Sequence, residues 1–590
     1  MGTARPAPGP YDAAVPTDEP APSDPALSPD PVEPDPVEPD PVEVLAPIAG
    51  VCVGVHVAPG EVVGARAVVV TLESMKTEHP VAAGTAGRVE AVMIVPGAAV
   101  DDGTPLVLLR PGAGSGGSAA TAAADDPTAE PTGTDRPDLA EVLRRRDLLA
   151  DDRRPDAVRR RAERGRRTVR ANVADLVDAG SLNEYGGLAV AAQRGRRPIE
   201  DLILRTPADG LVAGTATVGA PEVGDERARV AVLGYDATVL AGTQGFVNHR
   251  KTDRLLDVAA RRRLPVVLFA EGGGGRPGDI DAPGVSGLDV PSFARFAQLA
   301  GVVPTIAVVS GYCFAGNAAL AGCCDVIVAT EDSNLGMAGP AMIEGGGLGV
   351  VDPTDIGPID VQWANGVVDV RVPDEPAAVA AARDLLGFAQ GRRGPGRAPD
   401  QAPLRDAVPV ARRRAYDVRA IIRTLADEGS ILELRGGFGR GAVTALGRVD
   451  GRPVGFLANE PRHLGGAIDA AAARSATRFL GLCDRWGLPI VSLCDTPGFM
   501  VGPEAERTGQ VRVFGDLFLA AARARVPWVF VVLRKSYGLG AQAMAGGSLL
   551  EPDLTLSWPT GEFGGMGLEG AVRLGFAKEL DAIDDPEERA

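Results

Sequence analysis

Lysine is scarce in this chain, and one lysine lies where an amine could carry a covalent group. The chain has only four lysines, Lys76, Lys251, Lys535 and Lys578, while its 60 cationic side chains are otherwise arginine. Lys76 follows Met75 in the segment ESMKTE, between two valine-rich runs that read as the strands of a hairpin. A lysine amine can be acylated in a way that an arginine guanidinium cannot. The sequence therefore predicts a prosthetic-group attachment site at Lys76, with an ordinary exposed turn lysine as the alternative.

Two strand–glycine–helix junctions could stabilise negative charge on an oxygen atom. The first is VVSGYCFAGN, residues 308–317, and the second is VVLRKSYGLGAQ, residues 531–542. Glycine permits a sharp turn, and the first N–H groups of a helix have no partner inside the helix. Such donors, with the helix dipole, stabilise a developing oxyanion. One such junction is more often a plain structural turn, but two at equivalent places in a repeated pattern favour a chemical role.

Other common kinds of site are not indicated. The six cysteines contain no C-x-x-C pair and the four histidines lie far apart, so we expect no metal site. The net charge of −18 argues against a nucleic-acid partner, and we interpret the arginine-rich run 144–170 as a solvated charged helix. Without a membrane-spanning apolar run or a signal-peptide pattern, we expect a cytoplasmic protein with reduced thiols and no membrane contact.

Composition divides the N-terminal part of the chain into three segments. Residues 1–43 are rich in Pro, Asp and Glu and predict a disordered tail. Residues 44–110 predict a small all-β unit with an internal repeat, because Gly50 and Leu72 recur as Gly87 and Leu109 with matching residues between them. The repeat favours a flattened barrel whose exposed hairpin tip holds Lys76. Residues 111–138 predict a flexible linker with a root-mean-square span of about 30 Å.

From residue 139 onward the pattern is α/β, and it occurs twice. LVDAGSLNEYGG (176–187) resembles LADEGSILELRGG (425–437), and each copy continues with apolar runs that alternate with amphipathic segments. We expect helices at 251–263 and 467–486, within βαβ units. The sequence predicts two tandem copies of one fold, residues 139–390 and 411–590, separated by a Pro- and Arg-rich connector, residues 391–410.

The segment around Lys76 resembles the biotinyl domain of biotin-dependent carboxylases. Residues 46–50, APIAG, lie where that family has an Ala-Pro-Met-Pro-Gly stretch, and Met75-Lys76 matches its Met-Lys pair. The sequence departs from the family at Ser74, where alanine is usual, and at Thr77, where methionine is usual. Lipoyl domains share the fold but typically read Asp-Lys-Ala, so Met75 favours biotin over lipoate. The resemblance implies covalent biotin at Lys76.

The remainder of the chain, residues 139–590, resembles the biotin-dependent carboxyltransferases. The segments that carry the resemblance are GYDATVLAGTQGFVNHRKTDRLLDVA, SGYCFAGNAALAGCC, CDTPGFMVGPEAERTGQ and LRKSYGLGAQAM. Within this acetyl- and propionyl-CoA carboxylase β type, the multidomain long-chain acyl-CoA carboxylases look most similar. The resemblance implies a pair of crotonase-like domains, with acyl-CoA bound mainly to the first and biotin bound to the second domain of a neighbouring protomer. A homodimer at minimum, and a hexamer in the family's usual form, would follow.

The same resemblance implies roles for individual residues. Ala315 and Gly316 would donate N–H groups to the thioester oxygen, and Leu539 and Gly540 would donate to the ureido oxygen of biotin. The family usually has glycine at position 315, but an alanine N–H donates equally well. The residues expected to wall the biotin pocket are Thr496, Pro497, Gly498 and Phe499. Those expected to flank the CoA ester are Gly242, Gly245, Arg250, Lys251, Gly273, Gly274 and Arg276, with a surface role as the alternative for Arg250 and Lys251.

The expected function is transfer of a carboxyl group from N-carboxybiotin, on the chain's own carrier domain, to the α-carbon of an acyl-CoA. No protein side chain serves as the base in this scheme. The chain shows no ATP-grasp domain, so a separate ATP-dependent biotin carboxylase and a biotin protein ligase are the expected partners. It also lacks the Cys-x-x-Cys pairs of the zinc-bearing β subunit found in split acetyl-CoA carboxylases.

Three other functions remain open from the sequence. A biotin-dependent acyl-CoA decarboxylase would run similar chemistry in reverse. A non-catalytic scaffold that presents biotin would require occluded oxyanion sites. A crotonase-like hydrolase or isomerase would not need a carrier lysine. The length of the acyl chain depends on the depth of the pocket, and no pattern in the sequence predicts it.

Overall fold

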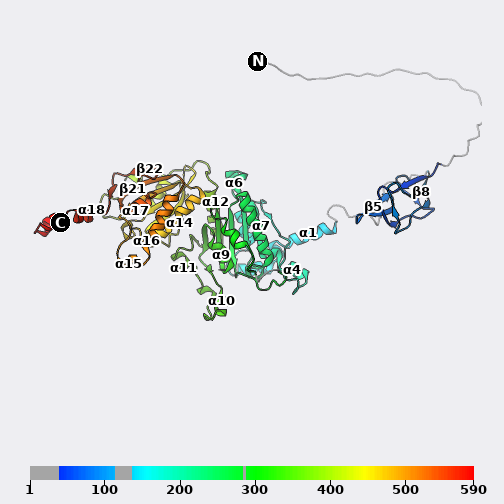
Figure 1. The fold of residues 1–590 in the computed structure, drawn as a ribbon, viewed down its shortest axis with the longest axis horizontal. Coiled ribbons are helices and arrows are strands. Elements are labelled where there is room, and N and C mark those ends of the chain that lie inside the picture. The colour runs from blue at the N-terminus through cyan, green and yellow to red at the C-terminus, as the bar shows by residue number, and fades with distance from the viewer. Residues whose placement is uncertain (1–38, 113–135, 283–286, 590) are drawn as a thin grey trace, which may run out of the picture. The chain divides into compact units, whose positions relative to one another are not determined.

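The computed structural model describes residues 39–112, 136–282 and 287–589, which fall into two compact units (Figure 1). The first unit ends at Glu130 and the second begins at Pro131. Most of the predicted tail and of the predicted linker lies outside the described residues, and the ends that are described extend β1, which begins at Val42, and α1, which begins at Pro137, beyond the predicted boundaries. Each unit is described below by itself.

The first unit is built from two four-stranded antiparallel sheets. One has the order β1-β8-β6-β3 and the other the order β5-β4-β2-β7. The strands are β1 (Val42–Leu45), β2 (Gly50–Val55), β3 (Val62–Val63), β4 (Val68–Ser74), β5 (Thr77–Ala82), β6 (Gly87–Val92), β7 (Ala99–Val100) and β8 (Pro105–Pro111). Valine and leucine side chains that face inward, such as Leu72 and Leu109, are completely buried between the sheets.

The internal repeat of this unit has a steric reason. A Cβ atom on Gly50 would lie 2.6 Å from the carbonyl oxygen of Glu73, and one on Gly87 would lie 2.6 Å from that of Arg110. Both distances are far inside van der Waals contact, so only glycine fits where the crossing strands approach. The two glycines recur because the two halves of the unit make the same close backbone contact.

The first half of the second unit is a mixed sheet in the order β16-β14-β13-β12-β11-β10-β9, with β15 beside β13. Strands β11 to β14 and β16 are parallel, as βαβ units require, and the β10–β11 hairpin is antiparallel. The bounds are β9 (Asn183–Glu184), β10 (Leu211–Thr217), β11 (Arg229–Tyr235), β12 (Val266–Gly272), β13 (Thr305–Phe314), β14 (Val326–Thr330), β15 (Asn334–Gly336) and β16 (Val370–Val372).

The second half repeats this arrangement in the order β17-β18-β19-β20-β21-β22, with β23 beside β21. Its β18–β19 hairpin matches β10–β11, and β19, β20, β21 and β22 are parallel. The bounds are β17 (Leu432–Leu434), β18 (Ala442–Val449), β19 (Arg452–Asn459), β20 (Ile490–Thr496), β21 (Trp528–Tyr537), β22 (Leu554–Ser557) and β23 (Glu562–Gly564).

Equivalent helices occupy equivalent places in the two halves. The long helices are α7 (Phe246–Arg262) and α14 (Ala470–Trp486), and the short helices after the glycine junctions are α9 (Gly316–Gly322) and α17 (Gly538–Met544). The predicted C-terminal ends of α7 and α14 agree with the structure to within a residue. The predicted start of α7 is five residues late, because its first turn is capped through Asn248, whose side chain accepts from the N–H of Gly245 at 3.1 Å.

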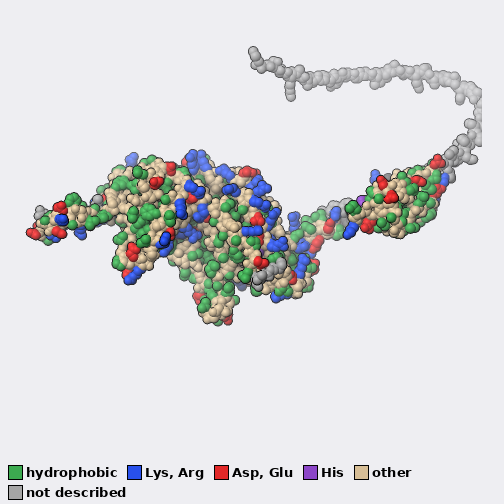
Figure 2. Space-filling view, in the orientation of Figure 1, with side chains coloured by type: hydrophobic (Ala, Val, Ile, Leu, Met, Phe, Trp, Pro, Cys, Tyr) green, Lys and Arg blue, Asp and Glu red, His purple; other side chains and the backbone are tan. Residues whose placement is uncertain are grey.

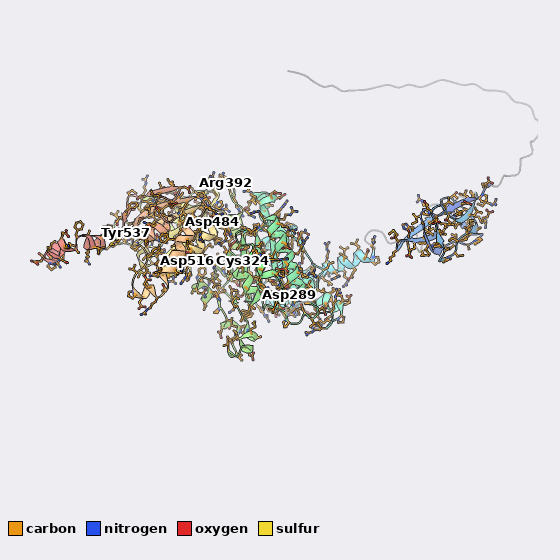
Figure 3. The ribbon with its side chains drawn as sticks, viewed as in Figure 1. Asp289, Cys324, Arg392, Asp484, Asp516 and Tyr537 are labelled. Atoms are coloured by element: carbon orange, nitrogen blue, oxygen red, sulfur yellow. The ribbon has the colours of Figure 1, made fainter. Side chains whose placement is uncertain are left out.

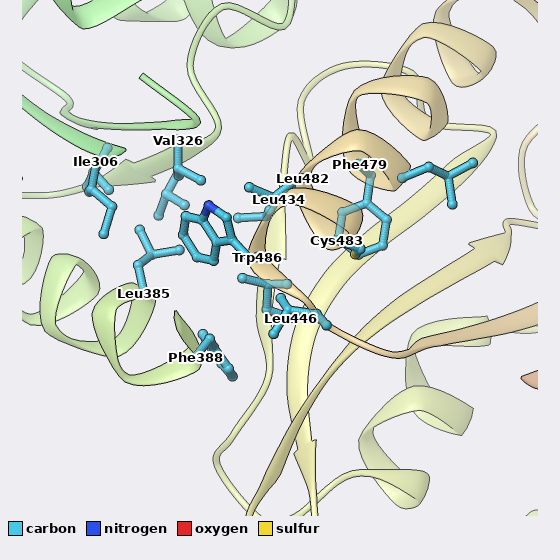
Figure 4. Close-up of a cluster of buried hydrophobic side chains, with 14 of the residues drawn as sticks. Ile306, Val326, Leu385, Phe388, Leu434, Leu446, Phe479, Leu482, Cys483 and Trp486 are labelled. Carbon is cyan, nitrogen blue, oxygen red and sulfur yellow. The ribbon is translucent and has the colours of Figure 1, made fainter. Parts of the chain in front are cut away.

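The two halves share one hydrophobic core (Figure 4). The indole of Trp486, from α14, lies among Leu385 and Phe388 of α12 (Glu375–Ala389) and strand residues of the first half. Its Nε1 donates to Asp325 at 3.0 Å. Since apolar packing and a buried hydrogen bond cross the boundary, the two halves fold as one body.

The arginine-rich run 144–170 does not form the single solvated helix that we expected. The segment contains α1 (Pro137–Asp147), a 3-10 turn (Asp151–Arg153), α2 (Pro155–Ala162) and the start of α3 (Val169–Leu176). Pro155 opens α2 and interrupts any longer helix. Arg161 makes a largely buried ion pair with Glu271 at 2.6 Å. The run therefore attaches the start of the unit to β12.

The surface carries local positive charge despite the net charge of −18. Figure 2 shows Lys and Arg side chains gathered on the face around α7, where Arg250, Arg254, Arg261 and Arg262 are exposed. Within the described ranges, no helix has both the length and the apolar character needed to cross a membrane.

Candidate functional site

Lys76 lies at the tip of the β4–β5 hairpin. Ser74 and Thr77 form the last pair of the ladder, so Met75 and Lys76 alone make the turn. Their φ angles are 50° and 66°, the two left-handed residues of a type I′ turn. Met75 is 97% exposed and Lys76 is also exposed. The turn thus projects the lysine amine into solvent, where a covalent group could be attached and could reach a second site.

The first glycine junction presents a free backbone donor at Gly316. Gly316 opens α9, and its N–H has no hydrogen-bond partner among the described residues. A Cβ atom on Gly316 would lie 2.1 Å from Oε1 of Gln244, so the site admits only glycine without movement. The helix start therefore offers an N–H beside a buried amide side chain.

Ala315 differs from its predicted role. Its N–H donates to the carbonyl oxygen of Gly336 at 3.1 Å, where β15 pairs with β13. The prediction treated the N–H groups of both junction residues as free. The residues around the junction could not indicate the bond, because its acceptor lies in a three-residue strand that begins 19 residues downstream. In this structure the N–H of Ala315 belongs to the sheet and Gly316 remains the donor.

The glycine-rich end of β12 packs directly against this junction. Gly274 has a φ of 84°, and a Cβ atom there would lie 3.2 Å from the N atom of Gly316. Asn317 holds the neighbouring segments together: its Nδ2 donates to the carbonyl oxygens of Gly242 at 3.1 Å and Glu271 at 2.9 Å. The structure therefore brings the predicted residues Gly242, Gly273 and Gly274 to the N-terminus of α9.

Two cations predicted to bind substrate, Arg276 and Lys251, are held in buried polar networks. The side chain of Arg276 is 4% exposed and forms an ion pair with Asp209, which is completely buried, while its Nη2 donates to Thr243 O at 2.8 Å. Lys251 is 7% exposed and its Nζ donates to the carbonyl oxygens of Ala208, at 2.7 Å, and Leu211.

Burial lowers the pKa of Lys251 and distinguishes its environment from that of Arg250. Loss of water lowers the pKa of Lys251 to about 8. The alternative of a surface cation is therefore wrong for Lys251. Arg250 is exposed, with its guanidinium carbon 5.9 Å from the centroid of the Phe246 ring, and its place beside the CoA ester stays a prediction.

A cavity of about 720 Å³ lies beside Gly316. Its lining combines residues before and at the start of α7 with residues after β12. They include Gln244, Gly245, Phe246, His249, Arg276, Asp289, Phe293 and Gly316. The segment 242–251 was expected beside the CoA ester, but sequence reasoning singled out neither Gln244 nor His249 within it, and it missed the role of the Asn317 side chain. The spacing of His249 and Asp253, four residues apart on one helix face, is the signal that could have indicated the histidine.

The second junction is the counterpart of the first. The N–H groups of Leu539 and Gly540 at the start of α17 have no partner among the described residues. A Cβ atom on Gly540 would lie 2.8 Å from Cα of Gly498, so α17 packs directly on the turn after β20. Ile468 forms a parallel bridge with Phe499 just as Gln244 does with Gly275. The two halves therefore share the geometry of the site as well as the fold.

The predicted wall of the second site is brought to this junction. Thr496 is completely buried, and its Oγ1 hydrogen bonds with both N and O of Gly498 at 3.1 Å. The ring of Phe499 stacks on Phe514 with centroids 3.9 Å apart. Pro497 lies between these anchored residues, at the exposed side of the turn. Thr496 to Phe499 thus form a rigid turn against Leu539 and Gly540.

The two junctions lie well apart within the second unit. Figure 3 labels Asp289, which lines the first cavity, and Tyr537, which precedes the second junction, in different halves.

No group of His, Cys, Asp and Glu in the described ranges is arranged to hold a metal ion.

Comparison with known families finds two matches. Residues 160–589 match the carboxyl transferase domain, and residues 42–109 match the domain of biotin-requiring enzymes. The 12S subunit of methylmalonyl-CoA carboxyltransferase from Propionibacterium freudenreichii subsp. shermanii is 32% identical over 73% of this chain and 81% of its own length. The long-chain acyl-CoA carboxylase beta4 subunit of Mycobacterium tuberculosis is 32% identical over 77% of this chain and 85% of its own length.

Solved structures give the same picture. A single-chain, multi-domain long-chain acyl-CoA carboxylase superposes with a TM-score of 0.74 and 54% identity over 94% of this chain. This chain spans about half the length of that protein, 52%. A hexameric transcarboxylase 12S structure with methylmalonyl-CoA bound superposes with a TM-score of 0.68 and 29% identity, over 79% of this chain and 88% of that one.

Proposed function

This chain belongs to the carboxyl transferase family, and on that premise we propose that biotin attached at Lys76 exchanges a carboxyl group with an acyl-CoA held at Gly316. The family and the biotin-requiring domain make the chain a carboxyl-transferring enzyme that acts between biotin and acyl-CoA. The proposal adds which residues of this chain hold each reactant.

Lys76 fits the attachment of biotin by its position and chemistry. The amine is exposed at the tip of a two-residue turn, with no neighbouring strand to block an approaching enzyme. When bound, biotin supplies the carrier for the carboxyl group. Leu539 and Gly540 are proposed to donate to its ureido oxygen, and Thr496, Pro497, Gly498 and Phe499 to form the wall beside it.

Gly316 is proposed to stabilise the acyl-CoA as it loses its α-proton. Negative charge then develops on the thioester oxygen, and a preorganised N–H placed there lowers the barrier. Gly245 and Arg276 line the cavity beside it, while Lys251 and Arg276 hold its framework. Loss of one such donor typically costs about 3 kcal/mol of transition-state stabilisation.

The observation that carries the proposal is the duplicated junction. Each half places at a helix start backbone N–H groups to which no described residue bonds, packed on a glycine turn after the neighbouring strand. Two oxyanion-stabilising sites are what a transfer between two carbonyl compounds requires, one for the donor and one for the acceptor.

The separation of the two junctions supports a homo-oligomer. Because they lie in different halves of one unit, the acyl-CoA site of one protomer would meet the biotin site of another (Figure 3). We propose a homodimer at minimum and a hexamer as the full assembly. The solved transcarboxylase 12S relative is described as a hexamer in a multienzyme core.

The remaining parts of the proposal concern partners and location. A separate ATP-dependent biotin carboxylase would load the biotin, and a biotin protein ligase would attach it. A cytoplasmic location remains a prediction, supported by six cysteines that are all free thiols.

Intact-mass analysis of the chain from its native host tests the attachment site. We expect a mass increase of one biotinyl group in the wild type and none in Lys76→Arg, which keeps the charge but removes the acylatable amine. The variant should also show no acyl-CoA carboxylation when a biotin carboxylase is supplied. An unmodified wild-type chain in a host with active biotin ligase would contradict the proposal.

A further inference from the structure

One buried side chain in the cavity beside Gly316 has no role in the reaction described above. His249 of α7 is 8% exposed and lines the cavity, with its ring at an angle to Phe293 and the centroids 6.0 Å apart. Gly316 and His249 both approach Phe293, since a Cβ atom on Gly316 would lie 3.2 Å from the Cζ atom of that ring. The imidazole therefore lies close to the proposed thioester site.

A chain of three buried side chains fixes the protonation of this imidazole. Nδ1 of His249 lies 2.9 Å from Oγ of Ser292, which donates to Oδ1 of Asp253 at 2.7 Å. The carboxylate of Asp253 only accepts, so it takes the single hydroxyl hydrogen of Ser292. Oγ must then accept from His249, which places the ring hydrogen on Nδ1 and leaves a lone pair on Nε2.

The lone pair of Nε2 is presented to the cavity. Nε2 has no hydrogen-bond partner among the described residues, although the residue is more than nine-tenths buried. Burial lowers the pKa of His249, which keeps the ring neutral and its Nε2 an acceptor. The atom itself is open to the cavity, since it is not one of the fully buried polar atoms without a partner, and a ligand with an N–H or O–H group can take the place of solvent there.

Among the described residues of the cavity wall, none donates to Nε2 of His249. Arg276 directs its donors at Asp209 and at the carbonyl oxygen of Thr243, and Asp289 adds a further acceptor. A ligand that fits must therefore bring N–H or O–H groups of its own. A saturated acyl chain has none, whereas the pantetheine arm of CoA has two amide N–H groups and a hydroxyl.

We propose that His249 binds the acyl-CoA by accepting a hydrogen bond at Nε2 from the pantetheine arm. Ser292 and Asp253 are positioning residues that hold the imidazole in the accepting tautomer. This inference rests on the proposed function, because it requires the thioester to be at Gly316. It assigns recognition of the CoA part of the substrate to a side chain that is separate from the oxyanion donors.

Two substitutions of His249 separate its contact with the ligand from its contact with Ser292. His249→Asn keeps an amide near Ser292 and withdraws the acceptor from the cavity. His249→Gln reaches into the cavity with a carbonyl oxygen and gives up Ser292. For the biotinylated full-length protein, we would measure the Kd of CoA and of an acyl-CoA by calorimetry, together with kcat, KM and the melting temperature.

The proposal predicts that His249→Asn weakens binding of CoA and acyl-CoA alike, by about tenfold, as expected for one lost hydrogen bond. His249→Gln should bind both nearly as the wild type does, with a lower melting temperature. A purely structural histidine would give the reverse order, because only the Gln variant loses Ser292. A loss confined to acyl-CoA would overturn the assignment to pantetheine and point to the acyl chain.

The same titration separates this inference from the function on which it rests. Failure of the wild-type chain to bind CoA would overturn the proposed function together with the inference. Tight wild-type binding that is unchanged in His249→Asn would overturn only the role of His249.

Discussion

At the scale of single residues, we expect the addition of one methyl group to lower the catalytic rate most at Gly316. In Gly316→Ala the new Cβ would lie 2.1 Å from Oε1 of Gln244, which is buried and donates through Nε2 to Tyr235. The helix start must shift, and its N–H moves away from the oxyanion. We expect kcat to fall by roughly 10²- to 10³-fold, measured as initial rates of acyl-CoA carboxylation.

Gly322→Ala is the matched control for this substitution. Gly322 lies at the other end of α9, and a Cβ atom there would have no neighbour within 4 Å. Its rate and melting temperature should equal those of the wild type. Equal kcat values for Gly316→Ala and Gly322→Ala would remove Gly316 from the proposed mechanism.

Residues whose role follows from local chemistry could be predicted, and residues whose role depends on a distant partner could not. The exposed lysine of a Met-Lys turn and the glycine at a helix start are visible in a few neighbouring residues. The hydrogen bond that occupies the N–H of Ala315 requires β15, and the burial of Lys251 requires a turn at 208–210 with three consecutive positive φ angles. Neither partner can be identified from the local pattern.

At the scale of elements, a buried ion pair connects the two halves of the second unit. The guanidinium of Arg435, near the end of β17, pairs with Asp369, near the start of β16, and both side chains are at most 1% exposed. Asp369 also accepts from the N–H of Ile327 at 2.8 Å. Loss of the carboxylate would leave a buried arginine without its partner.

We therefore expect Asp369→Ala to lower the free energy of unfolding by about 3–5 kcal/mol, measured by denaturant unfolding. Asp156→Ala removes an exposed pair with Arg159 and should cost less than about 1 kcal/mol. Equal decreases in the free energy of unfolding for the two variants would show that the buried ion pair between the halves stabilises the protein no more than an exposed pair does.

At the scale of the whole molecule, the order of domains could be predicted from the sequence, and the size of the cavity could not. The predicted fold, a small β unit followed by two crotonase-like α/β domains, is confirmed by the family and structural matches. Repetition made this possible, because each pattern occurs twice in the sequence. The cavity combines the residues around Gly245, those after Arg276 and Gly316 itself, which only the folded sheet brings together.

If Lys76 carries biotin to the second unit, the length of the linker should control the rate of turnover. Residues 113–135 lie outside the described residues, and the composition of 111–138 predicts a coil with a root-mean-square span of about 30 Å. Deletion of half of this segment should lower turnover with the attached biotin, because the carrier reaches fewer sites. Turnover with a separately added biotinylated unit, residues 39–112, should not change.

A scrambled linker of equal length and composition is the control for this deletion, and it should retain full turnover. Loss of activity in the scrambled variant would show that the linker acts through its sequence and not through its reach.

At the left-handed turn of Met75 and Lys76, the residues that would be most stable differ from the residues that the proposed function requires. Asparagine followed by glycine adopts this turn with the least strain, whereas each ordinary side chain costs about 1 kcal/mol or more there. A thermostability screen would therefore favour substitutions at both positions and would discard the carrier lysine in doing so. A mutagenesis library intended to raise the thermal stability of this protein should leave Met75 and Lys76 unchanged. Variants should be selected for bound biotin as well as for heat resistance.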